Sequence, residues 1–510
     1  MEYVENSPRR VTNHDIAAGA GMALLSKFGA VIELISHPIY IWLFGLTSYG
    51  LYAVLWSAIN MVENFADLGM TSALQRMVPQ AGNVAARTRI LRLAVVIGLV
   101  PCTVVALAAF LMADQLAEYM NVAAQDRAML VDHIRLFSAA LPLWAFVEIA
   151  TSALRACRVF GAEIRLRTFW EQLVRLALAV GFWWSGFDIT GLLLAHLLSL
   201  GIVVLLSGRL LARHYDLGQM MSRSSDSRAV VRELMFAGLA TLPYNIATRL
   251  YSDAPALILN VSMPGASGAK AAALYIIARK ISSLAQMIRV AFAYVVAPLA
   301  SQAAASGDRE AISELYGYAA RLSTTIALPL TAAICAGAPA ILDYFGHQTS
   351  ATWVSIAILS LARALEAAGG QAAQIQQVIG RYRHAVYGSF LGITLAGAIA
   401  AITIPLWGLD GASASVAAGL LLSTGISLYQ VHRHHDMHPF DRRFAATATR
   451  ALGVAAMVVI GSSLALELPR FIRILAWLLV FMLGLWSSLR LALSTQDKSA
   501  LGRLQDALRL

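Results

Sequence analysis

Long apolar stretches, separated by short charged or turn-rich segments, recur along the whole sequence. A helix of about 18 residues or more is long enough to cross the roughly 30 Å hydrocarbon core of a bilayer. The apolar stretches reach that length, so the pattern predicts transmembrane helices. The fourteen predicted spans are 16–44, 51–78, 90–113, 129–157, 168–186, 190–212, 233–262, 271–301, 318–342, 353–380, 384–406, 411–432, 447–467 and 471–493.

The composition agrees with this pattern. Hydrophobic residues make up 58% of the chain and charged residues 13%, with a mean hydropathy of +0.66. A soluble domain carries roughly 25% charged residues, because its surface must be solvated. We therefore predict an all-α polytopic membrane protein, which excludes a soluble enzyme, a secreted module and a nucleic-acid-binding protein.

The excess of basic residues predicts the orientation in the membrane. The net charge is +10, and cytoplasmic loops of membrane proteins collect Lys and Arg. If the amino terminus lies inside, the fourteen crossings place most arginines in inside loops. The outside loops then hold only Arg127, Lys270, Arg470 and Arg473. We expect both termini to be cytoplasmic.

The chain also divides into two related halves. Tyr49–Val54 opens one predicted helix, and Ala272–Ile277 opens another in the same way, which suggests an internal repeat of the kind found in transporters. A Ser- and Arg-rich segment between the halves is typical of a flexible hinge. The predicted parts are an N-terminal lobe at 1–212, a hinge at 213–232, a C-terminal lobe at 233–432, and two extra helices with a tail at 433–510.

Motifs for catalysis, ATP or metal are weak. There is no phosphate-binding Gly-x-x-x-x-Gly-Lys-[Ser/Thr] segment, so an ATP-driven pump is not expected. The outside loops are too short for a catalytic domain. The three cysteines show no metal or disulfide spacing, and the histidines at 432–438 lie in a basic loop. We expect no enzyme activity, no cofactor and no metal.

Ionisable residues inside the predicted helices are the informative group. Each costs roughly 2.5–3.5 kcal/mol at the membrane centre, so each should face a partner, water or a ligand. One interpretation is structural ion pairing, to which Glu148, Arg155, Glu171 and Arg175 are suited. The other is a water-filled cavity that binds an anion such as phosphate or pyrophosphate. The candidate cations for such a cavity are Lys27, Arg249, Arg279, Lys280, Arg289 and Arg363, and the candidate coupling or cavity carboxylates are Glu33, Glu63, Asp67, Asp253 and Glu366.

Asn245, Arg249 and Asp253 are spaced four residues apart, which places them on one stripe of a helix. This spacing predicts that Asp253 holds Arg249 in place when no ligand is bound. A bidentate phosphate contact would replace that pair when the site is full.

Two segments resemble a known family. Ser48-Tyr49-Gly50-Leu51-Tyr52-Ala53 and Ala66-Asp67-Leu68-Gly69-Met70-Thr71-Ser72-Ala73-Leu74 resemble the Wzx-type polysaccharide repeat-unit flippases, which belong to the multidrug/oligosaccharidyl-lipid/polysaccharide exporter superfamily. The resemblance implies two pseudo-symmetric six-helix lobes around a V-shaped central cavity, plus two extra helices. It also implies export of undecaprenyl-pyrophosphate-linked oligosaccharide across the bacterial plasma membrane for surface polysaccharide synthesis.

The resemblance further implies alternating access driven by a proton or sodium gradient, with cavity cations holding the lipid pyrophosphate. The expected partners are the lipid-linked oligosaccharide, the coupling ion, membrane lipids and polysaccharide polymerase machinery, and no nucleic acid.

Three other functions stay open at this point. A drug/cation antiporter of the same superfamily would use Glu33, Glu63 or Asp67 as its coupling carboxylate. A membrane glycosyltransferase, polymerase or ligase would need a large external loop, which is missing. A major-facilitator transporter would explain Asp67-Leu68-Gly69, but the arginine pair that should follow is absent.

Overall fold

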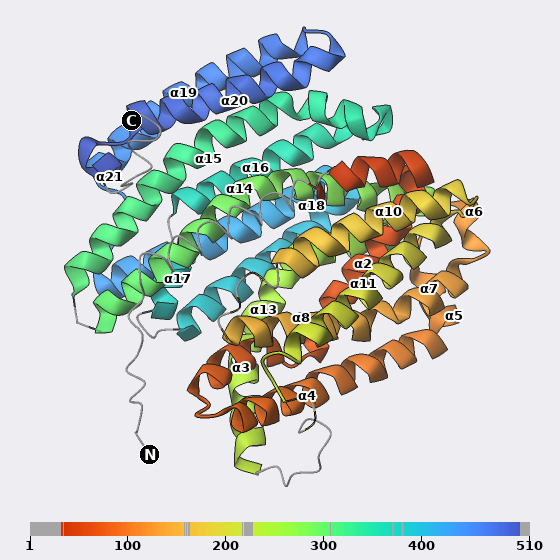
Figure 1. Ribbon diagram of the computed structural model, residues 1–510. Helices are drawn as coiled ribbons and strands as arrows, with labels where there is room; N and C mark the ends of the chain where they lie inside the picture. The colour runs from red at the N-terminus through yellow and green to blue at the C-terminus, as the bar shows by residue number, and fades with distance from the viewer. Residues whose placement is uncertain are drawn as a thin grey trace. The chain divides into compact units, whose positions relative to one another are not determined.

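A computed structural model describes residues 32–33, 35–157, 159, 161, 164–216, 218, 228–305, 308–369, 372–378 and 382–499. Within these ranges the protein is helical and contains no strand (Figure 1). After a helix at Ile35–Phe44, the elements are α2 (Leu46–Ala66), α3 (Met70–Met77), η1 (Val78–Gln80), α4 (Val84–Leu111), α5 (Ala113–Tyr119), α6 (Ala124–Arg127), α7 (Leu130–Ser138), α8 (Ala140–Ala156), η2 (Ile164–Trp170), α10 (Glu171–Trp184), α11 (Ile189–Leu211), α13 (Arg228–Ser262), α14 (Ala266–Ala305), α15 (Arg309–Phe345), η3 (His347–Thr352), α16 (Trp353–Ala368), α17 (Ala372–Val378), α18 (Tyr382–His435), α19 (Arg442–Leu466), α20 (Arg470–Ala492) and α21 (Thr495–Ser499).

The all-helical membrane architecture that the sequence predicts is confirmed. Among the described residues, nine spans are both long and apolar enough to cross a membrane. The number fourteen stays a prediction. α18 contains one non-helical residue, Gly408 (φ 52°, ψ −118°), where its two arms meet between the predicted spans 384–406 and 411–432. A glycine fits there because it has no Cβ to clash at positive φ.

The described residues form two compact units. The first unit consists of those within Met1–His37, Val62–Met112 and His133–Leu242. The second consists of those within Pro38–Met61, Ala113–Asp132 and Pro243–Leu510. The predicted boundaries at residues 212 and 233 stay predictions.

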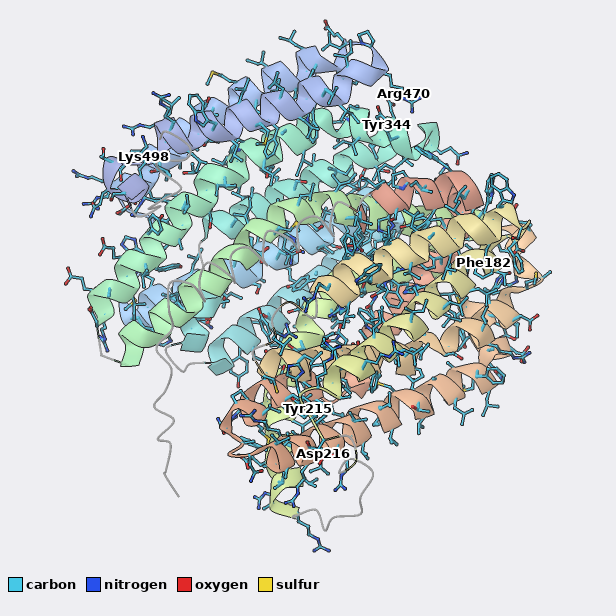
Figure 2. The ribbon with its side chains drawn as sticks, viewed as in Figure 1. Phe182, Tyr215, Asp216, Tyr344, Arg470 and Lys498 are labelled. Atoms are coloured by element: carbon cyan, nitrogen blue, oxygen red, sulfur yellow. The ribbon has the colours of Figure 1, made fainter. Side chains whose placement is uncertain are left out.

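In the first unit, α3, α4 and α8 enclose an apolar core. Met70, Leu74, Leu91, Ile149 and Leu154 are fully buried there. Within this core, the buried Tyr215 donates a 2.9 Å hydrogen bond to the carbonyl of Ala153, which attaches the segment after α11 to α8 (Figure 2).

The predicted helix at 51–78 is interrupted in the structure. α2 ends at Ala66, and α3 begins at Met70 after a turn. Asp67 accepts a 2.8 Å hydrogen bond from the backbone N–H of Gly69, and both Leu68 and Gly69 have positive φ. A Cβ on Gly69 would lie 2.3 Å from the carbonyl oxygen of Gly238, so α13 approaches this turn too closely for a side chain. The turn therefore needs glycine.

In the second unit, α14, α15 and α16 pack through small residues. Ala327, Ala364 and Ala367 are buried against Ile288, and small side chains allow membrane helices to approach closely. α19 packs against both α15 and α20 (Figure 1). The indole of Trp477 on α20 donates a 2.9 Å hydrogen bond to the carbonyl of Ala333 on α15.

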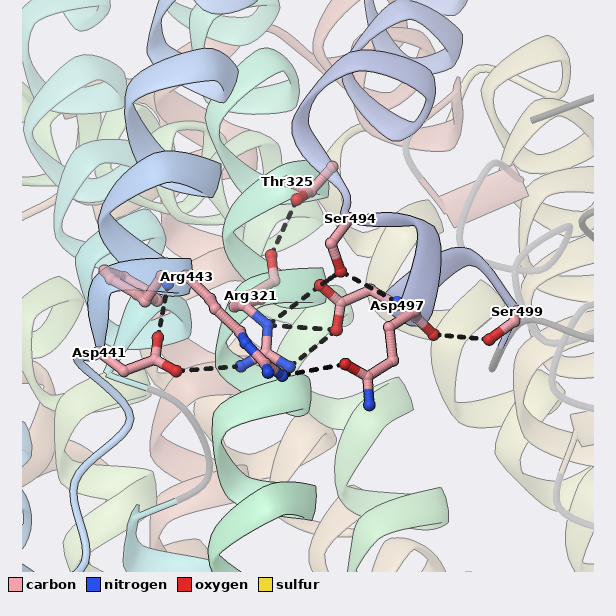
Figure 3. Close-up of polar contacts among 9 residues, drawn as sticks. Arg321, Thr325, Asp441, Arg443, Ser494, Asp497 and Ser499 are labelled. Carbon is pink, nitrogen blue, oxygen red and sulfur yellow. Dashed lines mark hydrogen bonds and ion pairs between the residues drawn. The ribbon is translucent and has the colours of Figure 1, made fainter.

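A buried ion pair holds the short helix α21 against α15 (Figure 3). The guanidinium of Arg321 donates to both carboxylate oxygens of Asp497, with a shortest distance of 2.7 Å from Nη2 to Oδ1. Ser494 donates to the same carboxylate at 2.7 Å. Burial alone would raise the pKa of Asp497, but the hydrogen bonds from Arg321 and Ser494 outweigh it and hold this pKa below its ordinary value.

Candidate functional site

A polar cavity lies within the second unit. Its walls come from one face of α13, from α14, α16 and α17, and from both arms of α18. The cavity has a volume of about 80 Å³, which is room for several water molecules. The lining residues are Tyr244, Thr248, Tyr251, Ser252, Gln286, Arg363, Glu366, Ala372, Ala373, Ser389, Leu420, Ser423, Thr424 and Ser427.

Helical periodicity explains how these side chains meet. On α13, Tyr244, Thr248, Tyr251 and Ser252 follow spacings of three and four residues, which place them on one face. Eight of the fourteen lining residues carry a hydroxyl group, and one more carries an amide. These groups can both donate and accept hydrogen bonds, so the wall suits a ligand with many hydroxyl or phosphate oxygens.

The charged part of the wall is an ion pair on α16. Nη1 of Arg363 lies 2.9 Å from Oε2 of Glu366, and the two side chains are 11% and 15% exposed. A pair three residues apart on one helix forms without help from a neighbouring element. Both residues are among the predicted site residues, and the structure brings them together in the cavity.

A second ion pair joins α13 to α14. Nη1 of Arg279 lies 3.0 Å from Oδ1 of Asp253 and also donates to the carbonyl of Ser252 at 2.9 Å. Asp253 is almost fully buried, whereas Arg279 is partly exposed. The sequence predicts Arg249 as the partner of Asp253. The structure instead pairs Asp253 with Arg279, because α14 packs back against α13.

Two other predicted cations lie at different positions on α13 and α14. Arg249 on α13 and Lys280 on α14 are both half-buried. Lys27 lies outside the described residues. Arg289 lies within α14, and its side chain is outside the described part of the structure.

The predicted carboxylates of the first unit have identifiable neighbours. Glu33 lies 3.9 Å from His37, one turn along the helix. Glu63 is buried and accepts a 3.0 Å hydrogen bond from Asn64. Asp67 is buried as well, but it caps the turn before α3, which gives this carboxylate a structural role.

The sequence interpretation missed two groups. One is the fully buried His196 on α11, whose Nε2 lies 3.9 Å from Oε1 of Glu171. Glu171 also pairs with Arg175 on its own helix, as the structural interpretation predicts. The other is the hydroxyl lining of the cavity. Its signal in the sequence is the spacing of Ser423, Thr424 and Ser427, which matches one helix face.

Comparison with known proteins identifies a family for this sequence and solved structures with the same fold. A model of the family described as polysaccharide biosynthesis protein matches residues 16–304. No curated protein matches the sequence.

Solved structures share the fold. Lipid II flippase MurJ, in an inward closed conformation, aligns with a TM-score of 0.73 over 91% of this chain and 97% of its own, at 10% identity. An inward-facing multidrug resistance MATE family transporter of the MOP superfamily aligns with a TM-score of 0.64 over 81% of this chain and 97% of its own, at 16% identity. A MOP superfamily transporter from Pyrococcus furiosus gives a TM-score of 0.60 over 81% and 94%, at 14% identity.

The resemblance to Wzx-type flippases is thereby confirmed at the level of family and fold. Because the family match covers more than half of the chain, the protein belongs to the polysaccharide biosynthesis protein family.

Proposed function

We propose that this protein is a flippase that moves undecaprenyl-pyrophosphate-linked oligosaccharide from the inner to the outer leaflet of a bacterial plasma membrane. The glycan serves surface polysaccharide synthesis. The protein works by alternating access between two lobes and is not an enzyme. Both of its termini lie in the cytoplasm.

The observation that carries the proposal is the hydroxyl-rich cavity in a chain of this family. Pockets for hydrophobic drugs are lined mainly by apolar and aromatic side chains. The cavity around Arg363 and Glu366 is lined instead by serine, threonine and tyrosine hydroxyls. Sugar hydroxyls can exchange hydrogen bonds with such a wall, whereas a hydrophobic cation gains little from it.

The cations that the sequence predicts supply the pyrophosphate contacts in this proposal, and Arg363 is the one that lines the cavity itself. Arg279 is held by Asp253 at 3.0 Å, and a phosphate oxygen can take over part of that contact. Arg249 and Lys280 lie on the same two helices. Lys27 and Arg289 are included in this set of pyrophosphate-binding cations on the basis of the sequence alone.

Ion coupling is part of the same proposal. Protons or sodium ions would bind a carboxylate in the membrane, and the candidates are Glu33, Glu63, Asp67, Asp253 and Glu366. Glu366 is the best-supported candidate, because it lines the cavity and can exchange its contact with Arg363 for a contact with an ion. The polymerase that uses the exported repeat unit is the proposed partner on the outer face.

The test is transport in proteoliposomes with a fluorescent polyprenyl-pyrophosphate oligosaccharide, whose exposure in each leaflet is read with a membrane-impermeant quencher. We expect Arg249→Ala to remove most transport while the reconstituted amount is unchanged. Arg249→Lys should keep part of it, because lysine keeps the charge but loses the planar fork. Arg209→Ala, at an exposed position in the last turn of α11, is the control.

A drug/cation antiporter is the rival function, because MATE transporters share the fold. The same vesicles loaded with a fluorescent cationic drug separate the two functions. Drug efflux without movement of the lipid-linked glycan would overturn the flippase proposal.

A further inference from the structure

A second cavity opens in the second unit, at the end of α15 and the start of α20. It has a volume of about 370 Å³ and is lined by Trp42, Asp343, Gly346, Arg470 and Arg473. Trp42 comes from the helix Ile35–Phe44, so three segments that are distant in sequence form the wall. None of these residues belongs to the polar cavity around Arg363.

The two arginines are held in defined positions. Arg473 donates to the Asp343 carboxylate at 2.8 Å and to the carbonyl of Leu468 at 3.3 Å. Arg470 donates to the carbonyl of Asp343 at 3.1 Å, and its guanidinium lies over the ring of Tyr344 at 5.0 Å (Figure 2). Guanidinium groups fixed in this way lose little conformational entropy when they bind an anion.

The charges lining this cavity do not balance. The lining contains two guanidinium groups and one carboxylate, so its net charge is +1. Each guanidinium has five N–H donors. Bonds to described residues use one donor of Arg470 and two of Arg473, so donors are left for a ligand. The first turn of α20 contains no acidic residue, and the dipole at this end of a helix also favours an anion.

The surroundings indicate that the anion belongs to a lipid. Trp42 is 58% exposed, and tryptophan and tyrosine side chains gather at the level of lipid headgroups. From the cavity onward, α20 presents the exposed apolar residues Ile472, Leu475, Leu479 and Met482. An acyl or polyprenyl chain can follow these residues while its headgroup occupies the cavity.

From this geometry we infer that the cavity of Trp42, Asp343, Arg470 and Arg473 binds the phosphate headgroup of a membrane lipid. Arg470 and Arg473 contact the phosphate oxygens. Asp343 holds Arg473 in place when the site is empty and competes with the phosphate for it. The inference concerns binding and does not depend on transport. The lipid source is either a bulk anionic phospholipid or a polyprenyl pyrophosphate.

The test measures lipid binding to the purified full-length protein by native mass spectrometry. The two probes are phosphatidylglycerol and undecaprenyl pyrophosphate, each titrated separately. We expect the double variant Arg470→Gln/Arg473→Gln to bind at least one probe tenfold or more weakly. The affected probe identifies the lipid source.

Arg490→Gln is the matched control, because Arg490 lies over Trp486 at 5.0 Å near the other end of the same helix. It should bind both probes as the wild type does. Asp343→Asn should change the affinity for the lipid probes in the opposite direction. It removes the competing negative charge and should tighten binding several-fold, whereas a purely structural cluster would show no gain.

Equal binding of both probes by the wild type and the arginine double variant overturns the inference. Weaker binding by Asp343→Asn overturns it too. If the double variant fails to fold, as judged by its thermal unfolding, the Asp343→Asn measurement decides alone.

Discussion

Each of the two units contains an Arg–Glu pair on a single helix, yet the surroundings of the two pairs differ. In the first unit, Glu171 and Arg175 on α10 are 3% and 6% exposed, with the buried His196 beside them. In the second unit, Arg363 and Glu366 on α16 line a cavity among hydroxyl groups. The same chemical pair is therefore enclosed by protein in one unit and borders a cavity with room for several water molecules in the other.

This difference matters for what each pair can do. Removing one member of an enclosed pair leaves a charge without solvent, which is strongly destabilising. A pair on a cavity wall can be solvated or can exchange partners with a ligand at lower cost. The first pair therefore stabilises its unit, and the second pair is available for function.

The largest expected effect is on the enclosed pair. Arg175→Leu should destabilise the protein by about 3–5 kcal/mol, because it leaves Glu171 buried without its guanidinium. The double variant Glu171→Leu/Arg175→Leu should recover much of that loss. Thermal unfolding and membrane abundance measure both effects, with Arg209→Leu as the exposed control. A double variant that is no more stable than the single variant would show that the loss of this ion pair does not cause the destabilisation.

The next effect concerns the cavity pair. Arg363→Gln should lower transport about tenfold or more while membrane abundance stays near the wild-type level, since water can solvate Glu366. Flipping in proteoliposomes and quantitative immunoblotting provide the two readouts. If abundance falls as far as in Arg175→Leu, the two pairs are equivalent and the comparison fails.

A smaller effect comes from the backbone packing of the first unit. Gly69→Ala should destabilise by about 1–3 kcal/mol, because it adds a Cβ at a positive φ of 74°, only 2.3 Å from the Gly238 carbonyl oxygen. Gly181→Ala is the control, since a Cβ there has no neighbour within 4 Å. It should be neutral or slightly stabilising. Equal melting temperatures for the two variants would contradict the close approach of α13.

The smallest effect appears only in acid and concerns Asp497, which pairs with Arg321. The pKa of this carboxyl is lower in the folded protein than the ordinary value near 3.9. Its contribution to stability is therefore complete above that ordinary value and is lost as the pH falls through the lowered one.

Limited proteolysis of the C-terminal segment at a series of pH values measures this contribution. Cleavage in the wild type should increase only below about pH 4. In Asp497→Asn it should be high at neutral pH as well and should change little with pH. A wild-type profile identical to that of the variant would exclude the ion pair as the contact that holds α21.

The positions of the helices could be predicted from the sequence because apolar length is a local property. Breaks within them could not. The turn after Ala66 depends on Asp67 capping Gly69 and on the approach of Gly238, which comes about 170 residues later. The predicted helix at 129–157, in contrast, continues as one span, because Ala139 between α7 and α8 keeps a helical backbone (φ −64°, ψ −17°).

The candidate site was predictable in the same partial way. The sequence identifies Arg363 as a candidate cation and Glu366 as a candidate carboxylate, and the structure pairs them. Spacing suggests Arg249 with Asp253, but α14 supplies Arg279 to that carboxylate from 26 residues away. Which helix packs against which is decided by tertiary contacts, so the sequence could identify the charged residues without identifying all of their partners.

The contact between Asn121 and Asn260 has a consequence for synthesis of the chain. Asn121 lies between α5 and α6, in the part of the second unit that precedes α7. Its backbone and side chain donate to Asn260, and the Asn260 side chain donates back at 2.6 Å. The two residues are 139 positions apart.

At elongation rates of about 5–20 residues per second, Asn121 leaves the ribosome on the order of ten seconds before Asn260 exists. During that interval Asn121 lacks the hydrogen bonds that Asn260 supplies in the folded protein. An insertase or chaperone that recognises nascent polar turns therefore has a defined time in which to act.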